Sequence, residues 1–139
     1  MDFDVGVMHA PIYSGLVAAL LLILHVVLMV RVIMRRGQAE VNIGDGGDEA
    51  LEQRIRVHAN LLENAPLFVA ALAMLEMIVG STVWVAVIGG VFAVARIGHA
   101  VGYSMTTGVS AGRLVGTLGT MISILAVAGY LGYVAITNL

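Results

Sequence analysis

One stretch of this sequence places charged and polar residues at helical spacing inside otherwise apolar surroundings. Arg56, Asn60 and Glu63 stand at positions i, i+4 and i+7, so a helix would carry all three on one face. Ionisable groups in an apolar helix are costly, and they are therefore candidates for function. The planar guanidinium group of an arginine can bind a carboxylate. The carboxylate of Glu63 and the amide of Asn60 could bind an amine and amide groups. The pattern predicts part of a binding site for a polar, mostly anionic molecule.

A second stretch repeats this arrangement. Arg96, His99 and Tyr103 stand at i, i+3 and i+7, again on one helical face. Measured along helices from the outer membrane surface, Glu63 would lie about 24 Å deep and Arg96 about 20 Å deep. Further cations fall near the same level, namely Arg35, Arg36 and Arg113. The alternative is a set of arginines that extend to the membrane interface, with one Arg–Glu pair.

Composition excludes several classes of protein. Of the 139 residues, 60% are hydrophobic and 12% charged, with a mean hydropathy of +0.99, whereas a soluble domain carries about 25% charged residues. The net charge is −2 and there is no basic run, so nucleic acid is not an expected partner. The absence of cysteine excludes disulfides, thiolate metal sites and a cysteine nucleophile. The histidines share no ligand spacing, so no metal is predicted.

Four apolar stretches must position the candidate residues. A helix over the first would be about 36 Å long, enough to cross a hydrocarbon core of about 30 Å. We therefore predict an all-α membrane protein, a single domain over 1–139 folded as a four-transmembrane-helix bundle. The expected helices cover about 11–34, 51–79, 83–103 and 113–136, and a flexible glycine-rich loop covers about 37–48.

The arginines also predict orientation. With alternating spans, every arginine falls towards one side, which the positive-inside rule makes cytoplasmic. Both termini are then expected on the non-cytoplasmic side. The N-terminus is acidic, so the first apolar stretch is expected to be a retained span and not a signal peptide.

Other polar and small residues have simpler interpretations. His25 is expected to be a packed histidine that makes one hydrogen bond, and Glu76 to lie near the outer interface without a function. Gly98 and Gly102 form one GxxxG pair, and Gly112 and Gly116 form another. Such pairs let membrane helices approach closely, so we expect a tight bundle.

The run from Arg56 to Leu67 resembles the helix-two signature of the MAPEG family, the membrane-associated proteins in eicosanoid and glutathione metabolism. The shared pattern is Arg, three residues, Asn, two residues, Glu, and then Pro66. The third apolar stretch repeats the match with Arg96, His99 and Tyr103. The glycine-rich loop looks like that of bacterial members, and the resemblance covers nearly the whole chain.

The resemblance implies a homotrimer that binds glutathione in a U-shaped form between adjacent protomers, near the cytoplasmic side. By matched position, Arg56, Asn60 and Glu63 would hold glutathione from one subunit. Arg96, His99 and Tyr103 would come from the third helix of its neighbour. The remaining matched residues are a basic pair that helps to close the site, and an arginine that activates the thiol: Arg35, Arg36 and Arg113.

The implied function is that of a membrane-bound glutathione transferase in a bacterial inner membrane. Its co-substrates would be glutathione and a hydrophobic or lipid-derived electrophile, with glutathione peroxidase activity as a further option. Leu114 replaces the serine of the prostaglandin E synthase branch, and Asn64 replaces an aromatic residue of the leukotriene synthase branch. The alternative within the family is a non-catalytic lipid-binding or scaffold protein. A small transporter is disfavoured because no pair of broken helices is present.

Overall fold

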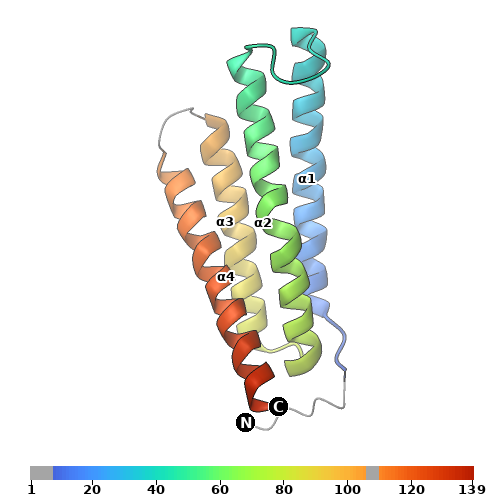
Figure 1. Cartoon of the computed structure of the whole chain (residues 1–139), viewed down its shortest axis with the longest axis vertical. Coiled ribbons are helices and arrows are strands. Elements are labelled where there is room, and N and C mark those ends of the chain that lie inside the picture. Colours follow the sequence, from blue (N-terminus) through green and yellow to red (C-terminus); the bar gives the residue numbers. More distant parts are fainter. Residues whose placement is uncertain (1–7, 106–109) are drawn as a thin grey trace.

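The computed structural model describes residues 8–105 and 110–139, which form an antiparallel bundle of four long helices (Figure 1). The loop between α1 and α2 lies at one end, here called the loop end, and the turn between α2 and α3 lies at the other. All four helices are long and apolar enough to cross a membrane, which confirms the predicted all-helical fold with four spans. The helices are α1 (Ile12–Ala39), α2 (Glu49–Val79), α3 (Val83–Met105) and α4 (Ala111–Thr137).

The first helix and loop differ from their expected bounds. Helix α1 continues to Ala39, so Gly37 belongs to its last turn and not to the loop. It stops where Glu40 takes a left-handed conformation with φ of 55°. Hydropathy marks only the apolar part of a helix, whereas its backbone continues until a cap ends it. Helix α2 begins early because the Asp48 side chain accepts a hydrogen bond from the N–H of Leu51.

Helix α3 is the most enclosed element. Half of its most apolar segment is buried, against 22% for α1 and for α4. It packs against each of the other helices, whereas α1 and α4 do not touch within the described residues. Phe92 is fully buried, and its ring stacks on Phe68 of α2 with the centroids 3.6 Å apart. Polar side chains of α3 are therefore carried into the interior.

Small residues allow α3 and α4 to approach closely. A Cβ on Gly102 would lie 2.8 Å from the backbone of Gly112, and one on Gly116 would lie 2.6 Å from the Cβ of His99. A Cβ on Gly98 would meet nothing within 4 Å. The expected packing role thus applies to three of the four GxxxG glycines.

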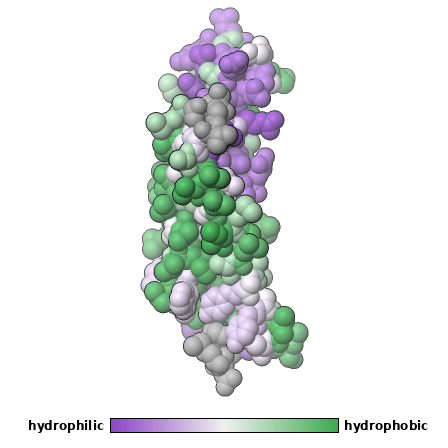
Figure 2. Space-filling view, turned by 90° about the vertical axis from the view of Figure 1, so that its left-hand side faces the viewer, coloured by the Kyte–Doolittle hydropathy of each residue, from purple (hydrophilic) through white to green (hydrophobic). Residues whose placement is uncertain are grey.

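The outer surface of the bundle is strongly apolar. On α1, the exposed fractions of Leu16, Leu22 and Ile23 are each close to two thirds. Figure 2 shows a hydrophobic belt between the hydrophilic loop end and a paler region at the opposite end. A belt of exposed apolar side chains is what a bilayer would cover.

Glu76 lies near the end of α2, as expected, but it has a structural role that the sequence did not indicate. Its carboxylate is fully buried and accepts hydrogen bonds from the backbone N–H groups of Tyr13 and Ser14. The hydroxyls of Ser14 and Ser81 also donate to it. Pro11, which precedes α1, provides no side-chain cap. Glu76 on α2 therefore caps the N-terminus of α1. This role depends on how the two helices pack, so the sequence alone does not indicate it.

Candidate functional site

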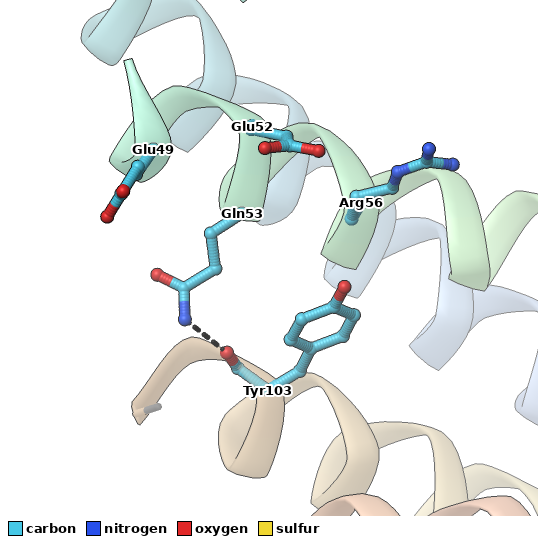
Figure 3. A pocket seen from close by; sticks show the side chains of 5 residues that line it. All are labelled: Glu49, Glu52, Gln53, Arg56 and Tyr103. Atoms are coloured by element: carbon cyan, nitrogen blue, oxygen red, sulfur yellow. Dashed lines mark hydrogen bonds between the residues drawn. The ribbon is translucent and has the colours of Figure 1, made fainter. Parts of the chain in front are cut away.

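A polar pocket of about 350 Å³ opens between α2 and α3 near the loop end (Figure 3). The Tyr103 ring rises from α3 towards α2, beside Arg56. The Gln53 side-chain amide donates to the carbonyl oxygen of Tyr103 at 2.7 Å, which ties the two helices together. The side chains lining this polar pocket are Glu49, Glu52, Gln53, Arg56 and Tyr103.

Arg113 supports the tyrosine wall of this pocket. Its guanidinium carbon lies 3.9 Å from the centroid of the Tyr103 ring, a cation–π contact. Ser110 positions the start of α4, because its hydroxyl accepts from the N–H of Arg113 and donates to the carbonyl of Gly102. The His99 ring meets Tyr103 edge-on with the centroids 5.8 Å apart. The structure thus brings Tyr103, His99 and Arg113 together within one chain.

Arg96 connects three helices beneath the pocket. Its side chain is 2% exposed and donates to the Asn60 side-chain oxygen at 2.5 Å and to the Thr120 hydroxyl at 3.3 Å. Arg96 Nε and His99 Nδ1 are buried without a hydrogen-bond partner among the described residues. The resemblance placed these two side chains against a neighbouring subunit. Within one chain, Arg96 contacts side chains of α2 and α4, and the contribution of Arg96 and His99 to a neighbouring subunit's site stays a prediction.

Glu63 lies away from the other members of its predicted face. It is exposed and lines an apolar groove of about 310 Å³ between α2 and α4, together with Leu67 and Ile124. The three residues predicted to share a binding face therefore have different surroundings. Arg56 lines the polar pocket, Asn60 is hydrogen-bonded to Arg96, and Glu63 lines the apolar groove.

Comparison with known proteins agrees with this architecture. Residues 14–133 match the MAPEG family. The chain belongs to the MAPEG family. This MAPEG chain is similar to the inner membrane protein YecN of Escherichia coli K12 and of E. coli O6:H1 strain CFT073. Each is 32% identical over 92 residues, which cover 63% of this chain and 70% of the relative. No solved structure matches.

The basic pair of this MAPEG chain does not reach the polar pocket. Arg35 forms two hydrogen bonds with the Asp48 carboxylate, one of which is also an ion pair of 2.5 Å. Arg36 donates to the carbonyl of Gly44 at 2.8 Å. Both cations thus hold the loop between α1 and α2, because its carboxylate and carbonyls lie within reach of the last turn of α1. That Arg35 and Arg36 help to close a ligand site between protomers stays a prediction.

Sequence reasoning missed four residues of this MAPEG site. Glu49, Glu52 and Gln53 line the polar pocket, and their spacing from Arg56 continues its face towards the start of α2. That spacing could have identified these three residues as pocket-lining candidates from the sequence. Thr120 gave no comparable signal, since a threonine in an apolar helix is common. No group of three histidine or acidic side chains in residues 8–105 and 110–139 could hold a metal ion.

The Asp48 contact predicts a pH-dependent loop in this MAPEG protein. Hydrogen bonds from Arg35 and from the backbone of Leu51 hold the pKa of Asp48 below its ordinary value of 3.8. Asp48 therefore stabilises the loop fully above that value and loses its contribution as the pH falls through the lowered pKa. Limited proteolysis from pH 7 to pH 3 should show faster loop cleavage only at the acidic end. Asp48→Asn should show faster cleavage already at pH 7.

Glu49→Gln is the matched control for this measurement. Glu49 is exposed in the first turn of α2 and makes no ion pair among the described residues. Its substitution should leave loop cleavage at pH 7 close to that of the unmodified protein. Equal cleavage of the Asp48→Asn variant and the unmodified protein at pH 7 would mean that the Arg35 contact does not order the loop.

Proposed function

We propose that this protein is a membrane-bound glutathione transferase that joins glutathione to hydrophobic electrophiles. Membership of the MAPEG family supports the class of substrate. The observation that carries the proposal is a cation, Arg113, stacked on the tyrosine that walls a polar pocket. The apolar surface that surrounds the helices favours substrates dissolved in the bilayer.

The groups that line the polar pocket complement glutathione. Glutathione has two carboxylates, one ammonium group, two amides and a thiol. The guanidinium group of Arg56 can bind a carboxylate of glutathione, and the carboxylate of Glu49 or Glu52 can bind its ammonium group. The side-chain oxygen of Gln53 can accept from an amide while its NH₂ group holds Tyr103. The pocket volume of about 350 Å³ lies in the range typical of small-molecule sites.

The proposed chemistry begins with the thiol. A thiol of pKa about 8.5 is mostly protonated at neutral pH, and the thiolate is the nucleophile. A positive charge beside the sulfur lowers this pKa, and the thiol proton passes to water. Arg113 retains its own proton, so it acts as an electrostatic stabiliser and not as a base. A sulfur electron pair then forms the carbon–sulfur bond, and the leaving group departs with the electrons of the bond that breaks.

The proposal includes an orientation and an assembly. The loop end carries Arg35, Arg36 and Arg54, so the positive-inside rule favours a cytoplasmic position for it, where glutathione is plentiful. Both chain termini would then lie on the other side. The similarity to an inner membrane protein of E. coli favours the bacterial inner membrane. A homotrimer, as the family resemblance implies, would cover part of the exposed apolar surface.

Arg56→Ala should weaken glutathione binding about tenfold, because the pocket loses its guanidinium fork. Isothermal titration of glutathione into the purified protein in detergent measures this directly. Arg54→Ala is the matched control, since Arg54 lies two residues away and donates to the carbonyl of Arg31. If both variants bind glutathione as tightly as the unmodified protein does, the polar pocket is not the glutathione site.

The non-catalytic alternative predicts a different result from the same preparation. A lipid-binding or scaffold protein would bind lipid without forming a glutathione thiolate. Ultraviolet absorbance of the thiolate and conjugation to 1-chloro-2,4-dinitrobenzene test this in trimeric protein. Absence of both signals would reject the transferase.

A further inference from the structure

The charges that line the polar pocket are the reverse of those that glutathione carries. The lining has two carboxylates, Glu49 and Glu52, and one guanidinium group, Arg56. Glutathione has two carboxylates and one ammonium group. Arg113 stacks on the Tyr103 ring, and in the proposed reaction its charge stabilises the sulfur. One carboxylate of glutathione therefore has no cation to bind in this pocket.

The cations of the neighbouring loop do not neutralise the two glutamates within the chain. Arg35 binds the Asp48 carboxylate, and Arg36 donates to the carbonyl of Gly44. Both glutamates are exposed in the first turn of α2, and neither forms an ion pair with another residue that the structure describes. Acidic side chains in a first turn also stabilise the helix, but that role does not distinguish one ligand from another.

The inner part of the pocket matches the amino-acid group at one end of glutathione. Glu52 and Arg56 stand at i and i+4, one helical turn apart. An α-amino acid group carries its ammonium and its carboxylate on one carbon, so a carboxylate and a guanidinium at this spacing can bind both. The γ-glutamyl end of glutathione has this group, and the glycine end has only a carboxylate. The pair therefore favours the γ-glutamyl end at Arg56.

The outer part of the pocket then faces the glycine end. Figure 3 shows Gln53 between Arg56 and Glu49. Glu49 precedes Arg56 by seven positions, which is about 10 Å along the helix axis. An extended tripeptide also spans about 10 Å. Glutathione bound in this direction places its glycine carboxylate near the Glu49 carboxylate, where like charges repel.

We propose that the polar pocket prefers a glutathione derivative whose glycine carboxylate is replaced by an amide that carries an amine. Glu52 and Arg56 bind the γ-glutamyl group, and Glu49 binds the added ammonium group. Glu49 is then the residue that determines which thiol is bound. This inference rests on the proposed glutathione transferase function and specifies the class of its thiol substrate.

Isothermal titration of the full chain in detergent tests the preference with three ligands. They are glutathione, its glycine amide, and its amide with 1,4-diaminobutane, which ends in an ammonium group. The diaminobutane amide should bind about fivefold more tightly than glutathione, because one exposed repulsion becomes an exposed ion pair. The glycine amide should lie between the two. Raising the salt from about 20 mM to about 500 mM should bring the ratio close to one.

Three variants assign the preference to single residues. Glu49→Gln should bind glutathione at least as tightly as the unmodified protein does, and should lose the preference for the diaminobutane amide. Glu52→Gln should weaken all three ligands by about the same factor, because each has the γ-glutamyl ammonium group. Glu40→Gln is the matched control, since Glu40 is exposed at the end of α1 and does not line the pocket. It should keep the fivefold preference.

The possible failures are distinguishable. Equal affinity for glutathione and the diaminobutane amide in the unmodified protein would reject the charge preference and leave the glutathione site in place. A preference that persists in Glu49→Gln would reject the role of Glu49. If none of the three ligands binds, the proposed function fails together with this inference.

Discussion

Arg113→Ala should lower the rate of glutathione conjugation about 100-fold while glutathione affinity changes by less than about threefold. The guanidinium carbon lies 3.9 Å from the Tyr103 ring centroid at the wall of the polar pocket. In the proposed reaction this cation stabilises the sulfur anion, so its loss raises the thiol pKa towards 8.5. Thiolate absorbance and conjugation should therefore fall together. Stopped-flow absorbance measures thiolate formation, and turnover of 1-chloro-2,4-dinitrobenzene measures conjugation.

Two controls distinguish this effect from a loss of structure. Arg113→Lys keeps a positive charge without the planar fork, so it should retain part of the thiolate signal. Arg54→Ala removes an arginine that contacts the carbonyl of Arg31 and should leave conjugation unchanged. The expected profile is a fall in kcat at nearly constant KM for glutathione. An Arg113→Ala protein with full thiolate absorbance would reject the electrostatic role.

Gly116→Ala should lower the free energy of unfolding by about 3 kcal/mol, through forced separation of α3 and α4. The added Cβ would lie 2.6 Å from the Cβ of His99 and 2.7 Å from the carbonyl oxygen of Ala95. Neither neighbour is the flexible end of a side chain, so a helix must move. That movement would also disturb Arg96, whose partner Thr120 is one turn further along α4. Thermal unfolding in detergent, followed by circular dichroism, measures the loss.

Gly98→Ala provides the matched comparison within the same pair of helices. A Cβ at this position would meet nothing within 4 Å, so packing is unaffected. Its thermal unfolding midpoint should lie close to that of the unmodified protein. If both variants unfold at the same temperature, the close approach of α3 and α4 does not limit stability.

Hydropathy alone determined the architecture of this protein. Long apolar runs interrupted by glycine and polar residues predicted four spans, because only helices satisfy their own backbone in hydrocarbon. The spacing of Arg56, Asn60 and Glu63 correctly placed all three on one helix, α2, where they have different surroundings. The motif around them also indicated the family, which the comparisons confirm.

Only the tertiary structure decided how the polar groups are partnered. Periodicity states which side chains share a face, whereas the relative position of two helices decides which groups meet. Arg96 therefore bonds to Asn60 within its own chain, and Arg35 binds Asp48 and not the pocket. Glu76 caps α1, and His25 meets His58. Each of these contacts joins residues on different helices or across a loop, and their distances depend on packing that spacing along one helix does not contain.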